Sequence, residues 1–440
     1  MDARFTPEFR RRTIAKVAWR LLPLVVVSYL VAYIDRTNIA FAALTMNQDL
    51  GLSAYIYGLG AGIFFIGYAL FEVPSNMVLE RVGARRWIAR IMISWGIISG
   101  LMAATAGPAS FLALRFLLGV AEAGFFPGII YYLSCWFPAV YRGRVISTLF
   151  VAVPISNAIA SVVSGAILGM DGIMGLHGWQ WVFIIEAAPA VLLALVVLKY
   201  MTDRPADATW LTPEERAWLE RELHAEREKV RSRGHLTLLQ TLTDRRVLAL
   251  SAIYLFSVTA GYGIVFFLPQ IIKALGHSNF MTGVLTAIPY TVGVIGLLLW
   301  GHSSDKRGER RWHLISALAL SAVGFVGVAL LRESIWAIAA MSVAAIGIYG
   351  SRPSFWPMPS MFLTGAAAAA GIALINSVGN LGGYVGPFIV GWIKNSTGSF
   401  EYALYFLAAC AAVSALITYL AAHATHEREP DAAAAAQLLK

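Results

Sequence analysis

Long apolar segments dominate this sequence and leave few choices for its fold. They fall at residues 19–44, 55–79, 87–106, 110–134, 145–170, 179–199, 247–272, 281–301, 312–331, 334–358, 365–393 and 400–422. A helix rises about 1.5 Å per residue, so about 20 residues cross a hydrocarbon core about 30 Å thick. Six segments precede a polar stretch at 199–246 and six follow it. The sequence therefore predicts an all-α integral membrane protein with twelve transmembrane helices in two six-helix bundles.

The composition agrees with a protein that lies mostly in the bilayer. Only 13% of the residues are charged and 58% are hydrophobic, whereas soluble domains carry about 25% charged residues. The net charge of +9 does not indicate nucleic-acid binding, because the basic residues sit in short clusters between the apolar segments. The two cysteines lie in or beside predicted spans, so no disulfide framework is expected.

The positions of the basic clusters predict the topology. Pairs or triplets of arginine occur at residues 10–12, 85–86, 142–144, 245–246 and 310–311, all on one side of the predicted bundle. Positive charge favours the cytoplasmic side. We therefore expect a multi-pass protein of the plasma (inner) membrane with both termini cytoplasmic. The basic first twenty residues lead directly into a full-length span, so no cleavable signal peptide is expected.

The same pattern predicts how the chain is divided. Residues 1–198 form the N-terminal bundle, 199–246 a cytoplasmic linker, 247–424 the C-terminal bundle and 425–440 a cytoplasmic tail. Within the linker, Thr212 followed by Pro213 and by Glu215 is typical of a capped helix start. We expect a charged, amphipathic helix there that connects the two bundles.

Among the charged residues inside the apolar segments of the first half, four can be placed together: Asp35, Arg36, Arg115 and Glu122. Asp35 and Arg36 are adjacent, so they point about 100° apart on a helix and each needs its own partner. Arg115 and Glu122 are seven residues apart and share one helix face. We expect these four to form one buried, balanced network in which protonation of an acid frees an arginine for an anionic substrate. A purely structural salt-bridge network is the alternative.

An internal repeat relates the two halves. Residues 76–86 and 301–311 each contain an acid (Glu80, Asp305), a base, a glycine three residues after the acid and a final Arg-Arg pair. These loops resemble the signature of the major facilitator superfamily, and the six-plus-six layout agrees with two pseudo-symmetric bundles. The acids can pair across the interface between the halves, and the arginines can anchor at headgroups. We expect a gating role for Glu80, Arg81, Arg85, Asp305 and Arg310.

Further motifs narrow this resemblance. The segments 33–38, 71–76, 115–124, 136–144, 203–205 and 376–383 resemble the anion:cation symporter family, which includes bacterial sugar-acid, tartrate and aromatic-acid permeases and the animal sialin and vesicular glutamate transporters. The resemblance implies that Asp35 and Glu122 couple to protons and that Arg36 grips a substrate carboxylate. It further implies that the substrate contacts Tyr33, Tyr68, Trp356, Ser360 and Asn376.

The tenth apolar segment differs from the others. It contains Pro353, Pro357 and Pro359, which predict a broken helix, and broken helices at membrane depth are tolerated where they line a cavity. Arg352 precedes the first of these prolines. It reaches either the cavity or the inner membrane interface, and the sequence leaves both open, together with the roles of Glu72 and Glu186.

The sequence thus predicts proton-coupled symport of a small organic carboxylate by a monomer in the lipid bilayer. Tyr33, Tyr68 and Trp356 can stack on an aromatic acid, whereas Asn157, Ser360 and Asn376 can bond to a hydroxylated one. We favour a hydroxylated sugar acid or a dicarboxylate such as tartrate. An aromatic-carboxylate permease, an anion exchanger or uniporter, and a non-transporting sensor are the alternatives. No enzymatic motif, cofactor, metal ion or nucleic-acid partner is expected, and sodium in place of protons stays open.

Overall fold

The computed structural model describes residues 5–232, 243–331, 333–362 and 365–426. Its first half consists of α1 (Pro7–Asp49), α2 (Ala54–Val82), α3 (Ala84–Leu101), α4 (Pro108–Glu122), α5 (Phe125–Ser134), α6 (Ala139–Ile167) and α7 (Gly178–Tyr200), with short 3₁₀ turns after α3 and α6. Helix α8 (Pro213–Ser232) follows in the linker.

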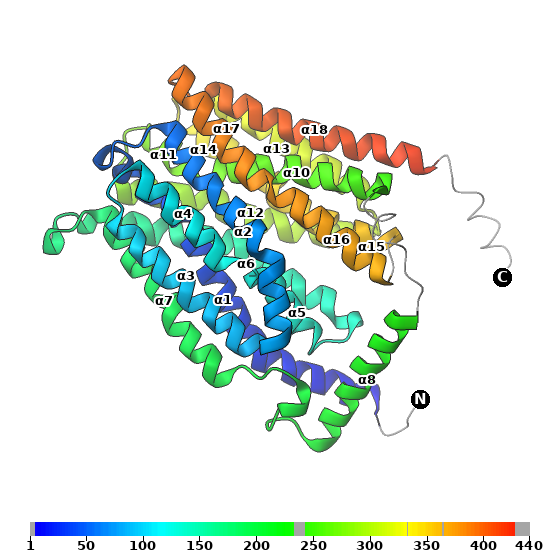
Figure 1. The fold of residues 1–440 in the computed structure, drawn as a ribbon. Coiled ribbons are helices and arrows are strands. Elements are labelled where there is room, and N and C mark those ends of the chain that lie inside the picture. The colour runs from blue at the N-terminus through cyan, green and yellow to red at the C-terminus, as the bar shows by residue number, and fades with distance from the viewer. Residues whose placement is uncertain (1–4, 233–242, 332, 363–364, 427–440) are drawn as a thin grey trace.

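The second half repeats this arrangement. It consists of α10 (Arg245–Val265), α11 (Leu268–Lys273), α12 (Asn279–Arg307), α13 (Arg311–Leu331), α14 (Trp336–Phe355), α15 (Met358–Phe362), α16 (Gly365–Asn380), α17 (Gly382–Thr397) and α18 (Glu401–His426). Figure 1 shows both sets of helices running along one common direction. We call the end where α1 begins, α18 ends and α8 lies the terminal face, and the other end the opposite face.

The predicted fold class is confirmed. Within the described part of the chain, eleven helical stretches are long and apolar enough to cross a membrane. Helix α14, which ends in the proline-rich segment, is a further helix of 20 residues that packs between α12 and α13. The large apolar side chains on the outer surface are consistent with contact with lipid, because such a surface would be unstable in water.

Several predicted spans are broken rather than continuous. The segment 110–134 divides into α4 and α5 at Gly124, which has a left-handed φ of 85°. The segments 247–272 and 365–393 also divide, into α10 and α11 and into α16 and α17. The proline-rich segment breaks between α14 and α15, but Pro353 lies inside α14, so a regular helix extends further than the three prolines predicted.

Glycines bring the two halves together at the opposite face. A Cβ at Gly58 of α2 would overlap the carbonyl of Pro387 in α17, and one at Gly283 of α12 would overlap the carbonyl of Ser161 in α6. The pairs α2–α17 and α6–α12 therefore touch backbone to backbone. Nearer the terminal face, the halves meet through side chains, such as the stacked rings of Phe150 and Trp356 with centroids 6.2 Å apart.

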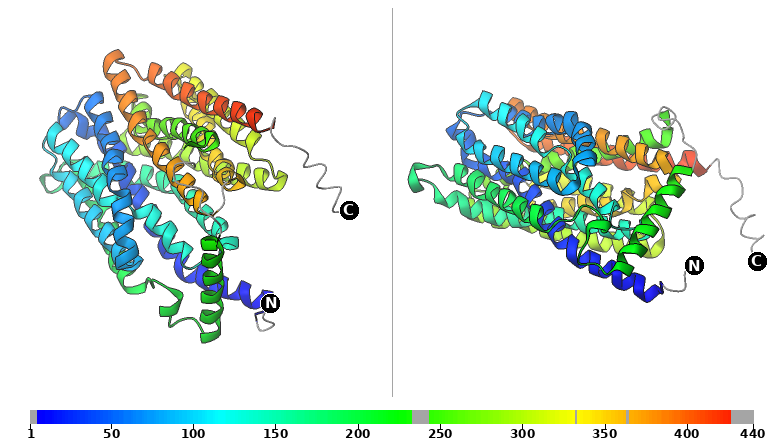
Figure 2. Two further views of the ribbon diagram at one scale, coloured as in Figure 1. Left: turned by 45° about the vertical axis from the view of Figure 1, so that its right-hand side comes forward. Right: turned by 60° about the horizontal axis from the view of Figure 1, so that its bottom comes forward.

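The linker helix α8 has the start that the sequence predicts and is attached to the first half. The backbone N–H of Thr212 donates to Glu215 Oε2 at 2.9 Å, and the Thr212 hydroxyl accepts from the N–H of Glu215 at 3.2 Å. The same carboxylate oxygen accepts from Lys16 Nζ of α1 at 2.7 Å. The right-hand view in Figure 2 shows α8 crossing the direction of the long helices. Most of the predicted tail at 425–440 lies outside the described residues.

Candidate functional site

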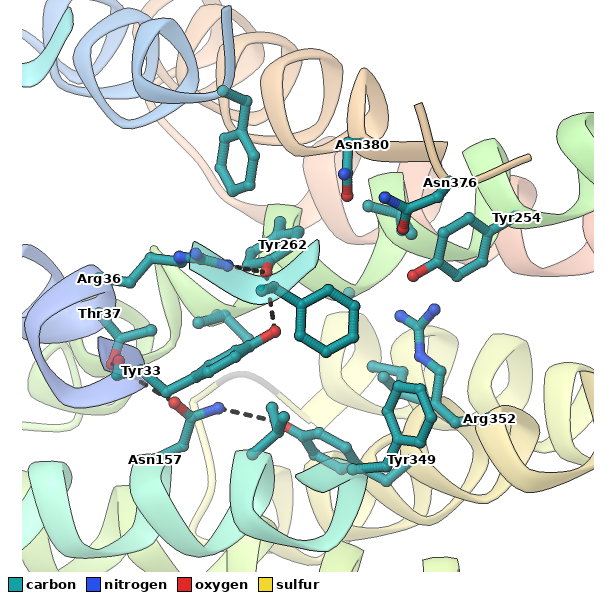
Figure 3. Close-up of a pocket in the computed structure, with 18 of the residues that line it drawn as sticks. Tyr33, Arg36, Thr37, Asn157, Tyr254, Tyr262, Tyr349, Arg352, Asn376 and Asn380 are labelled. Carbon is teal, nitrogen blue, oxygen red and sulfur yellow. Dashed lines mark hydrogen bonds between the residues drawn. The ribbon is translucent and has the colours of Figure 1, made fainter. Parts of the chain in front are cut away.

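A cavity of about 110 Å³ lies between the two halves. This is several times the space that one water molecule needs. Its lining combines polar side chains with many aromatic rings, and α1, α2 and α6 face α10, α14 and α16 across it (Figure 3). The polar and tyrosine residues of the lining are Tyr29, Tyr33, Arg36, Thr37, Tyr68 and Asn157 from the first half, and Tyr254, Tyr262, Tyr349, Arg352, Asn376 and Asn380 from the second.

Arg36 is the charged group that α1 places at this cavity. Its guanidinium Nη2 forms an ion pair with Glu122 Oε1, and its Nη1 donates to the Tyr262 hydroxyl at 3.4 Å. The guanidinium also lies over the ring of Tyr33, at 5.0 Å from the centroid, and over those of Phe64 and Tyr68 at 5.4 and 5.5 Å. The aromatic faces stabilise the cation, and the carboxylate neutralises it.

Glu122 reaches Arg36 because of the break in the fourth span. It is the last residue of α4, directly before the turn at Ala123 and Gly124. A Cβ at Gly124 would overlap the hydroxyl oxygen of Ser75, which itself accepts from the Trp87 indole at 3.0 Å. The close approach of α2 and the left-handed backbone both require glycine at this turn.

Asp35 points away from Arg36, as its adjacent position requires, and is 1% exposed. Its Oδ1 accepts hydrogen bonds from the Ser99 hydroxyl of α3 and, at 3.3 Å, from Asn38 Nδ2. Its Oδ2 is buried and has no hydrogen-bond partner among the described residues. Asp35 is thus held by neutral donors behind the cavity wall.

Arg115 does not join the other three in one salt-bridge network. It is fully buried, and its Nε and Nη2 donate to the carbonyls of Gly60 and Ala61 in α2 at 3.1 and 3.4 Å. Among the described residues, Arg115 therefore makes no ion pair with Glu122 or with Asp35 in this structure. The reason is that the turn at Gly124 directs the Glu122 carboxylate toward α1, whereas Arg115 is turned toward the carbonyls of α2.

A second set of hydrogen bonds connects the halves at the cavity. Asn157 Nδ2 of α6 donates to the Tyr349 hydroxyl of α14 at 3.0 Å, and its Oδ1 accepts from Thr37 of α1 at 3.4 Å. The hydroxyls of Tyr33 and Tyr262 lie 3.4 Å apart. Figure 3 shows these groups at the cavity, joined by hydrogen bonds that are drawn as dashed lines.

Most residues expected to contact the substrate lie in this lining, namely Tyr33, Arg36, Tyr68, Asn157, Trp356 and Asn376. The side chain of Ser360 lies outside those that the structure describes. Tyr254 and Tyr262, which are eight residues apart and share one face of α10, also line the cavity, as does Tyr349, although no sequence motif indicated these three residues. Helical spacing was the available signal, since residues 349 and 352 of α14 share one face with residue 356, which directly follows that helix.

Two further acids within the helices lie outside the lining: Glu186, which is buried, and Glu72, which is half-buried. Glu186 of α7 is 4% exposed and its Oε1 accepts from the Ser164 hydroxyl at 2.6 Å. Glu72 of α2 accepts from Asn376 Nδ2 of α16 at 3.5 Å, so it lies at the boundary between the halves. Neither residue is in an ion pair in the described part of the chain.

The residues expected to act as a gate lie at the terminal face. Asp305 pairs with Arg310 of its own loop at 2.5 Å, with the Asp305 side chain 70% exposed. The backbone N–H of Arg85 donates to Asp203 of the linker at 2.7 Å, whereas Glu80 and Arg81 are exposed. These contacts lie within one half or between a half and the linker, so the gating role stays a prediction.

Comparison with known proteins identifies the family. The model described as Major Facilitator Superfamily matches residues 25–387, with a second match at 250–439. A protein of Agrobacterium vitis named "Putative tartrate transporter" is 50% identical over 96% of this chain and 94% of its own length. A "Quinolone resistance transporter" of Acinetobacter baumannii is 46% identical over 94% of this chain and 95% of its own.

Solved structures agree at the level of the fold. A bacterial homologue of the human lysosomal transporter Spinster, in an inward-facing and occupied conformation, superposes with a TM-score of 0.74 at 18% identity. The superposition covers 92% of this chain and 96% of that one. Together with the helices and the central cavity, these matches show that the chain belongs to the Major Facilitator Superfamily and is a membrane transporter, not an enzyme.

Proposed function

We propose that this transporter couples the uptake of a small organic carboxylate to protons. The observation that carries the proposal is the ion pair between Arg36 and Glu122 at the wall of the cavity. Arginine binds carboxylates through a planar fork of N–H donors. The Arg36 fork therefore suits a substrate carboxylate, but Glu122 competes for it.

Protonation resolves this competition. A proton on Glu122 removes its negative charge and weakens its hold on Arg36, so the guanidinium can turn to a substrate anion. Substrate and proton then bind together, which is the requirement for symport. Asp35 offers a second proton site, because a proton there would remove the cost of burying a carboxylate that lacks a cationic partner. Release of both on the cytoplasmic side of the plasma membrane, where we propose that the termini lie, would complete the cycle.

The polar lining favours a hydroxylated substrate. Asn157, Asn376 and Asn380 and the tyrosine hydroxyls offer both donors and acceptors around the cavity. Relatives that share about half of this sequence are named for tartrate. We propose a hydroxylated sugar acid or dicarboxylate such as tartrate.

An aromatic carboxylate is the second candidate. Ten rings line the cavity: Tyr29, Tyr33, Phe65, Tyr68, Phe126, Phe150, Tyr254, Tyr262, Tyr349 and Trp356. One relative is named for quinolone resistance. A thermal-shift panel of purified protein, with tartrate on one side and benzoate and nicotinate on the other, distinguishes the two classes by which one raises the midpoint at lower concentration.

The coupling is tested with Glu122→Gln in proteoliposomes. This variant keeps the size of the side chain and mimics its protonated form, so substrate counterflow should persist. Accumulation of substrate against its gradient, driven by an imposed pH gradient, should be lost. Glu186→Gln is the matched control: Glu186 is also a buried acid, but it bonds to Ser164 away from the cavity, and pH-driven accumulation should persist.

Each other outcome points to a different mechanism. If Glu122→Gln still concentrates substrate in response to the pH gradient, Glu122 is structural and the coupling rests on Asp35. If the wild-type protein exchanges substrate but ignores the pH gradient, it is an exchanger, a uniporter or a sodium-coupled carrier. Binding without any flux would indicate a sensor.

A further inference from the structure

A second arginine faces the cavity from the C-terminal half. Arg352, near the end of α14, lines the same cavity as Arg36 of α1. In Figure 3 the two guanidinium groups lie on different sides of the cavity, with aromatic rings between them. The sequence alone left open whether Arg352 reaches the cavity or the membrane interface, and the structure places it at the cavity.

The surroundings of Arg352 differ from those of Arg36. Its guanidinium lies over the ring of Tyr254, 5.0 Å from the centroid, and its Nη2 is 3.8 Å from where a Cβ at Gly261 would lie. Its Nη1 is buried and has no hydrogen-bond partner in the described part of the chain. Tyr254 and Gly261 carry no charge, so these contacts stabilise the side chain without neutralising it.

Within the described part of the chain, Arg352 has no ion pair with an acid. The cavity lining contains two arginines and neither aspartate nor glutamate among the described residues. Glu122 is behind the wall and is paired with Arg36, and Glu72 accepts a hydrogen bond from Asn376. A cation with a buried, unsatisfied donor is costly, and an anion that supplies acceptors removes that cost.

We propose that Arg352 binds a second carboxylate of the substrate, which is therefore a dicarboxylate held between the two halves. This inference rests on the proposed role of Arg36 for the first carboxylate. Once Glu122 is protonated, the cavity presents two guanidinium groups, which match the charge of a dianion. A monocarboxylate would leave one guanidinium without a counter-charge. The two ends of one substrate would also bind α1 and α14, and so tie the halves together.

The test compares two ligands that differ in one carboxylate. L-Threonate is L-tartrate in which a hydroxymethyl group replaces one carboxylate, so the hydroxyls are retained. Dissociation constants for both are measured by calorimetry on wild-type protein and on Arg352→Gln in nanodiscs. The wild type should bind tartrate about 10- to 100-fold more tightly than threonate, the range expected for charge-assisted hydrogen bonds. Arg352→Gln should lose this preference through weaker tartrate binding, while the threonate constant changes by less than about 3-fold.

Two further variants make the outcome specific. Arg352→Lys keeps the charge but loses the fork, so its preference for tartrate should fall between those of the wild type and Arg352→Gln. It also serves if Arg352→Gln does not fold. Arg36→Gln should weaken the binding of both tartrate and threonate, because both ligands carry the carboxylate that is assigned to Arg36.

Three results would overturn the inference. If Arg352→Gln weakens the binding of tartrate and of threonate equally, or weakens the binding of neither, Arg352 does not bind the second carboxylate. If the wild type binds threonate as tightly as tartrate, the second carboxylate has no partner, although carboxylate transport itself stands. If the wild type binds neither ligand, the proposed substrate class is also wrong.

Discussion

The guanidinium of Arg36 lies between two kinds of partner, and this position defines its chemistry. On one side Glu122 neutralises it, and on the other it faces the cavity beside the Tyr262 hydroxyl. The rings of Tyr33, Phe64 and Tyr68 surround it without competing for its in-plane donors. A guanidinium suits this place because it can turn one pair of donors to Glu122 and another to a ligand.

Replacing Arg36 by lysine should therefore weaken substrate binding although the charge is kept. A lysine ammonium cannot present two parallel N–H groups to a carboxylate, and it stacks less well on aromatic rings. We expect an affinity loss of about 10- to 100-fold, the range for charge-assisted hydrogen bonds. Calorimetry or a thermal-shift titration on purified protein measures it. An unchanged affinity would show that Arg36 does not hold the carboxylate through its fork.

At the scale of elements, the turn between α4 and α5 positions Glu122. The left-handed φ of Gly124 ends α4 at the acid, and the neighbouring Ser75 leaves no room for a Cβ. Ser75 cannot easily yield, because it is buried and hydrogen-bonded to Trp87. The break between α4 and α5 thus places the Glu122 carboxylate where it can pair with Arg36.

Gly124→Ala should destabilise the protein and weaken the coupling. The left-handed backbone costs an L-residue about 1–2 kcal/mol, and the overlap with Ser75 adds to this. Gly143→Ala is the matched control, since Gly143 lies exposed in α6 with no atom within 4 Å of the added Cβ. Thermal unfolding in detergent should show a clearly lower midpoint temperature for Gly124→Ala. For Gly143→Ala the midpoint should change little or rise slightly. Equal effects at both positions would contradict this account of the turn.

The carboxylate of Glu215 both caps the start of the linker helix α8 and joins this helix to α1. Burial opposes the ionisation of Glu215, but its hydrogen bonds with Lys16 and with the Thr212 N–H outweigh this effect, so its pKa lies below the ordinary value. The ionised form therefore stabilises the attachment of α8 to α1. Trp218 of α8 also packs edge-on against Phe9 of α1, with centroids 6.1 Å apart.

We expect the attachment of α8 to weaken in acid. A lowered pKa means that the contribution of Glu215 is fully present above the unfolded value of about 4.3 and is lost as the pH falls through the folded value. A spin label at the exposed Ala217 should become more mobile over this interval. In Glu215→Gln the label should already be more mobile at neutral pH. The reason is that this variant loses the helix cap and the ion pair, which together stabilise the attachment of α8 by roughly 1 kcal/mol. A label that stays equally immobile in both proteins at all pH values would rule out this role.

For the whole molecule, the contacts between the halves differ from end to end. At the opposite face, Gly58 and Gly283 allow backbone contact, and the Tyr57 hydroxyl donates to the Phe266 carbonyl at 2.7 Å. Toward the terminal face, the contacts are made by side chains that can rearrange, such as Phe150 with Trp356. Rigid-body movement of one half against the other is the way in which such transporters alternate access.

Replacing Gly58 and Gly283 together by alanine should shift the population toward states that are open at the opposite face. The added methyl groups would overlap carbonyls of α17 and α6, and they disturb only the state in which these helices touch. Single cysteines at each face, probed with a membrane-impermeant maleimide, report the shift. Gly169→Ala, where nothing lies within 4 Å, is the control and should not change the labelling. Unchanged accessibility in the double variant would mean that these contacts do not select a state.

Neutralising the acids of the repeated loops, Glu80 and Asp305, should shift the population in the other direction, toward states that are open at the terminal face. If Glu80 or Asp305 pairs across the halves when the opposite face is open, Glu80→Gln or Asp305→Asn should favour opening at the terminal face. The same cysteine assay measures this. Labelling that matches the wild type in both variants would leave these acids with a role in topology alone.

The sequence by itself determined the class of fold and six of the residues that line the cavity, namely Tyr33, Arg36, Tyr68, Asn157, Trp356 and Asn376. Long apolar segments can satisfy their backbone in lipid only as helices, so their number and their six-plus-six division follow from the pattern. Charge inside such segments is costly, which singled out Arg36, Asp35, Glu122 and Arg115 without any knowledge of packing.

Only the tertiary structure decided which groups meet. Sequence spacing gives the depth of a residue and its helix face, but not how one helix is rotated toward the next. Arg115 and Glu122 share a face of one predicted helix, yet Arg115 bonds to carbonyls of α2 and Glu122 turns to Arg36 at a break that the sequence pattern did not predict. Arg352 likewise had two possible positions, and the packing of α14 between α12 and α13 directs it to the cavity.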